Sequence, residues 1–160
     1  MITQEELKKR FDYDKNTGLF KYRVDFRNGS KKGDIAGNKE FCGYWVITIN
    51  GRKYKAHRLA WLYVYGEFPK DQLDHINCKK DDNRISNLRQ ATRSQNHMNR
   101  HAYSNNALGV KGVYKQGNKF CSHIQKNKKR IHLGTFETIK EAYAVYVQYS
   151  KEMHGKFSRT

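Results

Sequence analysis

Residues 101–108 divide this sequence in two, because the stretch has no apolar periodicity and contains several turn formers. On both sides of it, short runs rich in β-branched and aromatic residues occur beside stretches of helical period. Separate strands and helices of this kind are typical of the α+β class. We therefore predict two small domains, residues 1–100 and 109–160, joined by a linker over 101–108.

The first domain is expected to be rich in β-structure before it reaches its longest helix. Residues 44–49 are rich in aromatic and β-branched side chains, which favours a strand, and the Asn50-Gly51 that follows favours a two-residue type I′ turn. Residues 57–65 then form a mainly apolar run that Gly66 closes, as expected of a largely buried helix. We therefore expect a β-rich N-terminal extension in this domain.

Three helix starts carry a capping box, in which a threonine and a glutamate or glutamine three residues later bond each other's backbone N–H groups. These pairs are Thr3 with Glu6, Thr92 with Gln95, and Thr138 with Glu141. We expect a short helix at the start of the chain, another from Thr92 to about Asn99, and a third near the C-terminus.

The second domain is expected to fold as a small three-stranded antiparallel sheet packed on one helix. The strands are expected over residues 113–115, 120–125 and 130–134, with tight polar turns between them. The residues predicted to form the sheet-facing side of the helix recur at three- and four-residue steps: Ala142, Val145, Tyr149 and Met153.

The alternation of side chains along the central strand assigns the two faces of this sheet. The residues expected to face the helix are Phe120, Ser122 and Ile124. Their neighbours Cys121, His123 and Gln125 are expected to point outward.

Positive charge dominates the composition, since 32 Lys and Arg against 15 Asp and Glu give a formal net charge of +17. The charge is spread along the chain: residues 1–100 carry 21 basic and 12 acidic groups, and residues 101–160 carry 11 and 3. A polyanion is therefore the expected partner. Composition alone also fits a ribosome-like or merely soluble basic protein, so the choice depends on the motifs.

Several other classes of protein are not indicated. No apolar stretch approaches the about 20 residues of a membrane span, and the N-terminus has no secretory pattern, so we expect a cytoplasmic protein. Cys42, Cys78 and Cys121 form no C-x-x-C pair and are expected to be reduced thiols. The sequence indicates neither a membrane nor an obligatory protein partner.

Residues 74–96 contain side chains suited to phosphodiester hydrolysis, which needs a metal, a base near neutral pKa and groups that fix this base. Asp74 offers a carboxylate oxygen and Asn96 an amide oxygen, ligands suited to one Mg²⁺ or Mn²⁺ with water and phosphate completing its shell. His75 could be the base, although neighbours on a strand point to opposite sides unless the strand ends or bulges there. A lone Asp-His pair is usually a solvated turn, so the assignment depends on the wider pattern.

This wider pattern resembles a known family. The segments AHRLAWLYVYGEFP and LDHINCKKDDNRISNLRQATRSQN are similar to the HNH homing endonucleases of phage introns and free-standing phage genes, over about residues 12–100. The resemblance implies a ββα-metal (HNH) nuclease fold over about residues 70–100. It also implies that Asp74 and Asn96 bind one divalent cation and that His75 is the general base.

Further residues near this site have two interpretations each. The resemblance implies that Asn87 orients the histidine, but an Asn-Leu before a strand is also an ordinary Asx turn. His57 could belong to the site, although a histidine at the start of a buried helix is more often packed and hydrogen-bonded. Arg84, Arg89 and Arg93 could hold phosphate around the metal, or they could face solvent.

Residues 109–157 resemble a second family, the ethylene-response-factor (apetala-type) DNA-binding domain of plant transcription factors and some phage endonucleases. The resemblance implies that the sheet face opposite the helix lies in the major groove of double-stranded DNA. The residues expected to reach DNA are Lys111, Tyr114, Gln116, Lys119, His123, Gln125, Arg130 and His132. Plant members have more Arg and Trp at the outward positions, so a larger share of binding here is expected from phosphate contacts.

Together these expectations describe a DNA endonuclease of homing type that nicks DNA or cuts both strands. One alternative is a DNA-binding regulator with an inert nuclease motif, since the C-terminal part alone resembles transcription factors. Another is an RNA-binding protein, although the sequence has no recognisable pattern for stacking single-stranded bases.

Overall fold

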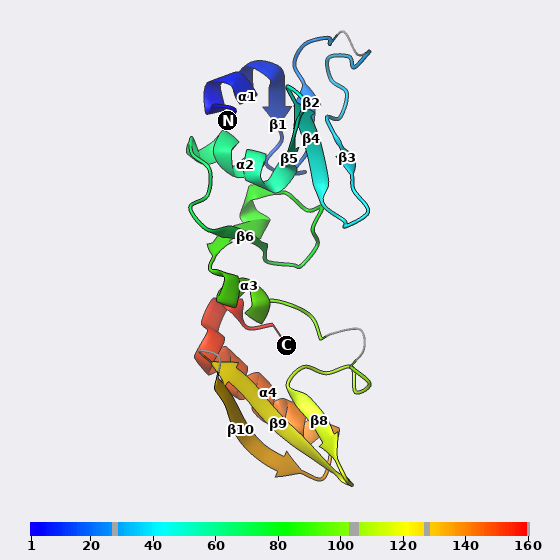
Figure 1. The fold of residues 1–160 in the computed structure, drawn as a ribbon, viewed down its shortest axis with the longest axis vertical. Helices are drawn as coiled ribbons and strands as arrows, with labels where there is room; N and C mark the ends of the chain where they lie inside the picture. Colours follow the sequence, from blue (N-terminus) through cyan, green and yellow to red (C-terminus); the bar gives the residue numbers. More distant parts are fainter. Residues whose placement is uncertain (27–28, 103–105, 127–128, 160) are drawn as a thin grey trace. The chain divides into compact units, whose positions relative to one another are not determined.

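The computed structural model describes residues 1–26, 29–102, 106–126 and 129–159, which separate into two compact units, residues 1–93 and 94–160 (Figure 1). Both units combine helices with short antiparallel strands, as predicted for an α+β chain. Of the predicted linker, residues 103–105 lie outside the described part. No helix among the described residues is long and apolar enough to cross a membrane.

The first unit opens with helix α1, at the capping box predicted there. Its elements are α1 (Gln4–Arg10), β1 (Phe11–Tyr13), β2 (Phe20–Tyr22), β3 (Asn38–Lys39), β4 (Trp45–Ile49), β5 (Arg52–Lys55), α2 (Ala56–Tyr65), β6 (Gln72–His75), a 3-10 helix (Ile85–Asn87) and β7 (Leu88–Ala91). Thr3 accepts a hydrogen bond from the backbone N–H of Glu6 at 3.2 Å, and Glu6 accepts one from that of Thr3 at 3.0 Å. Helix α3 (Arg93–Met98) begins at the last residue of this unit.

Strands β4 and β5 form the hairpin predicted from Asn50-Gly51. Asn50 has a φ of 50° and Gly51 a φ of 73°, and two positive values at the turn are typical of type I′. Strand β3 pairs with the other edge of β4, which gives the order β3-β4-β5. The chain enters α2 directly after β5 and leaves it at Gly66, whose φ of 84° is a left-handed conformation that glycine adopts at little cost.

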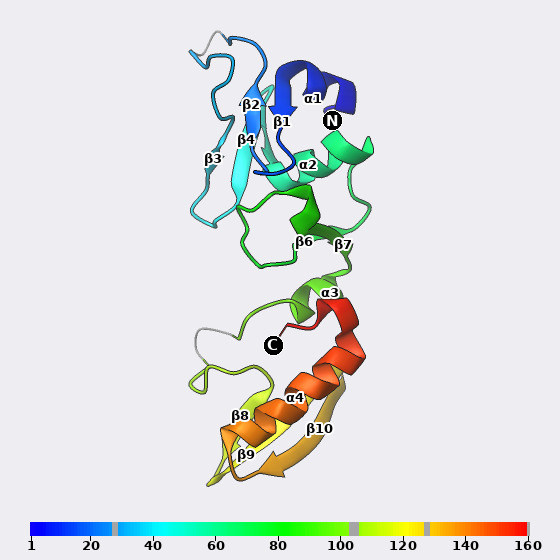
Figure 2. The same ribbon diagram turned by 180° about the vertical axis from the view of Figure 1, so that it is seen from behind.

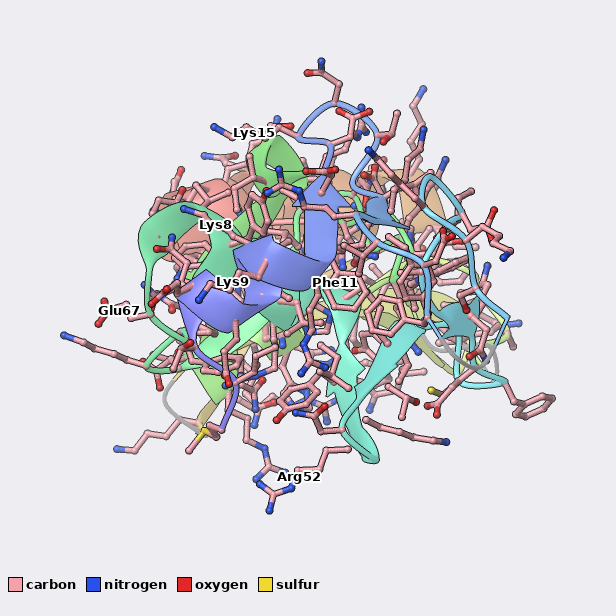
Figure 3. The ribbon with its side chains drawn as sticks, turned by 90° about the horizontal axis from the view of Figure 1, so that it is seen from above. Lys8, Lys9, Phe11, Lys15, Arg52 and Glu67 are labelled. Carbon is pink, nitrogen blue, oxygen red and sulfur yellow. The ribbon has the colours of Figure 1, made fainter. Side chains whose placement is uncertain are left out.

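Helix α2 forms the centre of the first unit, where it contacts α1, β4, β5 and the 3-10 helix. Figures 1 and 2 both show α1 next to α2 at the strands. The core includes Leu7, Phe11, Phe20, Ile47, Leu59 and Leu88. Figure 3 shows Arg52 and Glu67 extending from the periphery, whereas Phe11 is only 2% exposed. Because Leu88 belongs to this core, the β6–β7 hairpin is anchored to it.

The second unit is a three-stranded antiparallel sheet with helix α4 across one face (Figure 2). Its elements after α3 are β8 (Val113–Gln116), β9 (Lys119–Lys126), β10 (Lys129–Phe136), α4 (Ile139–His154) and a 3-10 helix (Gly155–Phe157). The strand order is β10-β9-β8, with β9 in the middle. Thr138 and Glu141 form the predicted capping box at the start of α4.

Helix α4 contacts the sheet by a face that differs from the predicted one. Its buried residues are Ala142, Tyr146 and Ser150. Of the other predicted residues, Val145 and Met153 are only half-buried, and Tyr149 is 37% exposed. The prediction of this face was therefore wrong except at Ala142.

Gly112 and Ser150 explain the difference. A Cβ at residue 112 would lie 2.0 Å from the ring of Tyr146, so the glycine makes room for that ring against the sheet. Ser150 is 1% exposed, and its hydroxyl lies 2.8 Å from that of Ser158. Because Ser150 is polar, the buried face of α4 does not show the regular spacing of apolar residues from which such a face is predicted.

Candidate active site

Asp74 and His75 are the last two residues of β6, where β6 pairs with β7 in antiparallel register. Asp74 lies opposite Arg89, and His75 lies opposite Leu88. Both side chains are buried, since Asp74 is 4% exposed and His75 is 6% exposed. Neighbouring side chains within a strand point to opposite faces of the sheet. Because the strand ends at His75, the side chains of Asp74 and His75 can both contribute to one site.

Asp74 is held by Arg89 across the hairpin. Nε and Nη2 of Arg89 lie 2.8 and 2.7 Å from Oδ2 of Asp74. The Arg89 side chain is 13% exposed, so the ion pair is largely shielded from water. Two charge-assisted N–H bonds from one planar group fix a carboxylate firmly. Arg89 therefore positions Asp74, a role that neither of the two interpretations from the sequence includes.

The imidazole of His75 is oriented by Asn83. Nε2 of His75 lies 3.2 Å from Oδ1 of Asn83, while Nδ2 of Asn83 donates to the carbonyl of Asp81 at 3.3 Å. Because the amide Oδ1 can only accept, this network assigns the ring proton to Nε2 and the lone pair to Nδ1. Burial lowers the pKa of His75 and outweighs the opposite effects of Asn83 and Asp74. At pH 7 the ring is therefore neutral and can accept a proton through Nδ1.

The loop between β6 and β7 is held by Asn87. Its Nδ2 donates to Oδ1 of Asn77 at 3.0 Å and to the carbonyl of Asp82 at 2.9 Å, and its Oδ1 accepts from the backbone N–H of Asn77 at 3.0 Å. The His75 ring contacts the side chain of a different asparagine, Asn83. Asn87 thereby supports the loop that carries Asn83, and its role in orienting His75 stays a prediction.

The N-terminal extension supports the same loop. The hydroxyl of Tyr13 donates to the carbonyl of Asn83 at 2.7 Å, and burial raises the pKa of Tyr13, so the hydroxyl stays a donor. A Cβ at Gly18 would lie 2.5 Å from the backbone N of Arg84, so only glycine allows this close approach. Arg84 pairs with Asp82 at 2.6 Å, and its hydrogen bonds are the main cause that lowers the pKa of Asp82 to about 2.

A second histidine packs against the first. The rings of His57 and His75 are T-shaped with centroids 5.0 Å apart, and the ring of Tyr44 lies 5.4 Å from that of His57 and 6.2 Å from that of His75. His57 is 6% exposed, and its Nδ1 is buried with no hydrogen-bond partner in the described structure. Burial is the main cause that lowers the pKa of His57 to about 3, and the charge that His75 would carry at low pH, when protonated, acts in the same direction. His57 is therefore a packed, neutral ring, although its Nδ1 lacks the expected bond.

Asn96, the second expected metal ligand, is half-buried in α3. It belongs to residues 94–160, so its approach to Asp74 stays a prediction. Arg93 is exposed at the start of the same helix. Within the described part of the chain, no three His, Cys, Asp or Glu side chains form a ligand group. An ion bound at the Asp74 carboxylate would complete its shell with amide, water or phosphate oxygens, which are ligands that Mg²⁺ accepts.

The outer face of the C-terminal sheet, opposite α4, carries most of the residues expected to contact DNA. The cross-strand pairs on this face are Gln116 with Lys119, Tyr114 with Cys121, His123 with His132, and Gln125 with Arg130. The guanidinium of Arg130 lies 5.2 Å from the centre of the Tyr114 ring, and its Nη2 lies 2.9 Å from Nε2 of His123. Tyr114, His123 and Arg130 therefore form one connected surface.

Two residues of this unit differ from their expected exposure. Cys121 lies on the outer face but is 1% exposed, because side chains such as Gln116, whose Oε1 is 3.0 Å from Sγ, cover it. The ammonium group of Lys111 donates to the backbone carbonyls of Met98 and Arg100. Lys111 thus binds the end of α3 and does not project from the sheet towards DNA.

Comparisons with known proteins identify the region that contains Asp74 and His75. Residues 54–98 match the family model described as HNH endonuclease, so this part of the chain is an HNH endonuclease region. An uncharacterized HNH endonuclease of Acanthamoeba polyphaga mimivirus is 33% identical over 116 residues, which are 71% of this chain and 60% of that protein. The chain therefore spans about 60% of the length of this curated relative.

Proposed function

We propose that this chain, which carries an HNH endonuclease region, is a metal-dependent DNA endonuclease with His75 as its general base. The observation that carries the proposal is the arrangement at the end of β6. There the buried His75 ring is oriented by Asn83, and the adjacent Asp74 is oriented by Arg89. A base and an anionic ligand, each fixed by a second residue, are what metal-assisted hydrolysis of a phosphodiester needs.

The metal would be held by Asp74 and Asn96. A carboxylate and an amide oxygen are hard ligands, which suits one Mg²⁺ or Mn²⁺. When bound, the ion would act as a Lewis acid that stabilises the negative charge developing on the phosphodiester as it is cleaved. The pair with Arg89 holds the Asp74 carboxylate in a fixed orientation in the buried site.

His75 would accept the proton that the attacking water molecule loses. Nδ1 takes a proton from a water molecule, whose oxygen attacks the phosphorus as the bond to the 3′-oxygen breaks. Asn83 continues to accept the hydrogen bond from Nε2 and so stabilises the imidazolium that forms. The leaving 3′-oxygen takes a proton from a solvent water molecule and the imidazolium returns its proton to solvent, so the products are a 5′-phosphate and a 3′-hydroxyl.

The C-terminal sheet would supply most of the DNA affinity. Its outer face combines Tyr114, His123 and Arg130 in one connected surface, and the chain as a whole carries a net charge of +17. We propose that this face binds double-stranded DNA in the manner that the ethylene-response-factor resemblance implies.

Relaxation of supercoiled plasmid DNA in Mg²⁺ tests the function. The natural protein and His101→Ala, which removes an exposed histidine outside the site, should nick the plasmid, and His75→Ala should not. The cut ends should carry 5′-phosphates. Absence of nicking from all three proteins, with DNA binding intact, would indicate a regulator with an inert nuclease motif. Equal nicking by His75→Ala would remove His75 from the mechanism.

A further inference from the structure

The ring of Tyr44 connects the histidines of the candidate active site to two lysines. Its centroid is 6.2 Å from that of His75. The ammonium group of Lys55 lies 4.2 Å from the same centroid, and that of Lys80 lies 5.2 Å from it. Lys55 ends β5 and Lys80 belongs to the loop between β6 and β7, so two separate segments bring positive charge to one ring.

These two lysines differ from their neighbours in how their charge is balanced. Lys39 pairs with Asp81 at 2.6 Å, and Lys53 pairs with Glu40 at 3.0 Å. Among the residues that the structure describes, no carboxylate lies within 4.0 Å of the ammonium group of Lys55 or Lys80. The nearby carboxylates are already bound to other cations. A π-face attracts an ammonium group but does not neutralise its charge.

Lys80 is also held in place by the backbone. Its ammonium group donates to the carbonyl of Cys42 at 3.1 Å, in the turn that precedes Tyr44. Its stem passes the same turn, since a Cβ at Gly43 would lie 3.6 Å from Cδ of Lys80. A long side chain that is fixed in this way loses less entropy when an anion binds it.

We propose that Tyr44, Lys55 and Lys80 form a clamp for one DNA backbone phosphate close to the scissile bond. The proposal rests on the proposed function in taking DNA as the substrate. Successive phosphates of one strand are about 3.4 Å apart along the helix axis. Because the centre of the Tyr44 ring lies 4.2 and 5.2 Å from the two ammonium groups and 6.2 Å from the centre of the His75 ring, the clamped phosphate lies within a few nucleotides of the cut. The clamp would set the register of the strand against the base.

Salt dependence of DNA binding, measured in EDTA so that no cleavage occurs, tests the clamp. The variant Lys55→Met/Lys80→Met should make the negative slope of log K against log salt concentration less steep by about 0.9, the value for one phosphate contact. The matched control Lys39→Met/Lys53→Met removes the same charge from lysines already paired, and should change the slope much less. Equal changes in both variants would overturn the clamp. Circular dichroism melting checks that both variants fold.

Neutral methylphosphonates placed singly along a cleaved duplex locate the contact. One substitution close to the cut should weaken binding by the natural protein about tenfold and have no further effect on Lys55→Met/Lys80→Met. The same methylphosphonate should still weaken binding by Tyr44→Phe, which keeps the aromatic ring beneath the lysines. It should have little effect on binding by Tyr44→Leu, which lacks the ring. If every methylphosphonate weakened binding by the natural protein and by Lys55→Met/Lys80→Met to the same extent, the clamp would be refuted even if the enzyme cuts DNA. If no DNA is cut, the nuclease proposal fails while the slope in EDTA still decides the clamp.

Discussion

The rings of His57 and His75 meet at 5.0 Å in a T-shaped contact, and both are almost completely buried. His57 has no hydrogen-bond partner at Nδ1 within the described structure, and its pKa of about 3 keeps it neutral at pH 7. A neutral ring at this position supports His75 sterically without adding a charge beside the base.

The steric role of His57 leads to a first prediction. His57→Phe should keep the cleavage rate within about tenfold, because a ring still packs against His75. It should not lower the free energy of unfolding, because it removes a buried nitrogen whose missing bond costs about 1 to 3 kcal/mol. His57→Ala should lose about 2 kcal/mol of stability and more activity than His57→Phe. A near-complete loss of activity in a well-folded His57→Phe would show that the imidazole itself takes part.

A second prediction concerns Asn83. Asn83→Ala should lower kcat/KM for DNA cleavage about 10-fold to 100-fold, because the ring of His75 loses the bond that fixes its orientation and tautomer. DNA affinity in EDTA should stay unchanged. The control is Asn16→Ala, an exposed amide of the same unit. The ¹⁵N chemical shifts of His75 should move from the Nε2–H tautomer to a mixture, and unaltered shifts would contradict this assignment.

Arg89 provides a third prediction, on stability. Arg89→Met leaves the buried carboxylate of Asp74 without its cation, and such a loss costs about 3 to 5 kcal/mol. Urea unfolding of the natural and variant proteins measures the difference. Lys53→Met removes a lysine from the exposed pair with Glu40 and should cost much less. Equal costs for the two variants would mean that the Asp74 pair is not shielded from water.

Short sequence patterns predicted many of the helices, strands and turns. The contacts that orient the residues of the candidate site could not be predicted in this way, because they join residues that are brought together only by the fold. Asn50-Gly51 fixed the β4–β5 turn, because few dipeptides adopt two positive φ values. Arg89 could have been assigned to Asp74 only from the register of β6 with β7, which the intervening loop sets. Asn83 lies within the segment that resembles the HNH endonucleases, but its bond to His75 depends on the path of that loop. Tyr44 meets the histidines only through the tertiary fold.

A fourth prediction follows from Asp82, whose pKa is lowered from 3.8 to about 2, chiefly by hydrogen bonds from Arg84. Because the folded-state pKa is below the unfolded one, Asp82 stabilises the fold fully above about pH 4, and this contribution is lost as the pH falls towards 2. Asp82→Asn should therefore lose less stability between pH 5 and 2 than the natural protein. Urea midpoints measured across this range test it, with exposed Asp71→Asn as the control. Parallel curves for the natural protein and Asp82→Asn would contradict the prediction.

The last prediction concerns Arg130, which contacts both Tyr114 and His123 on the outer face of the C-terminal sheet. Arg130→Gln should weaken DNA binding about tenfold or more, since an arginine contact to a base edge contributes about 1 to 3 kcal/mol. Single-turnover cleavage at saturating protein should stay unchanged, because Arg130 is not part of the β6–β7 site. Lys151→Gln, an equal change of charge on exposed α4, is the control and should have little effect on affinity. Equal weakening by both variants would mean that net charge, and not this face of the sheet, holds the DNA.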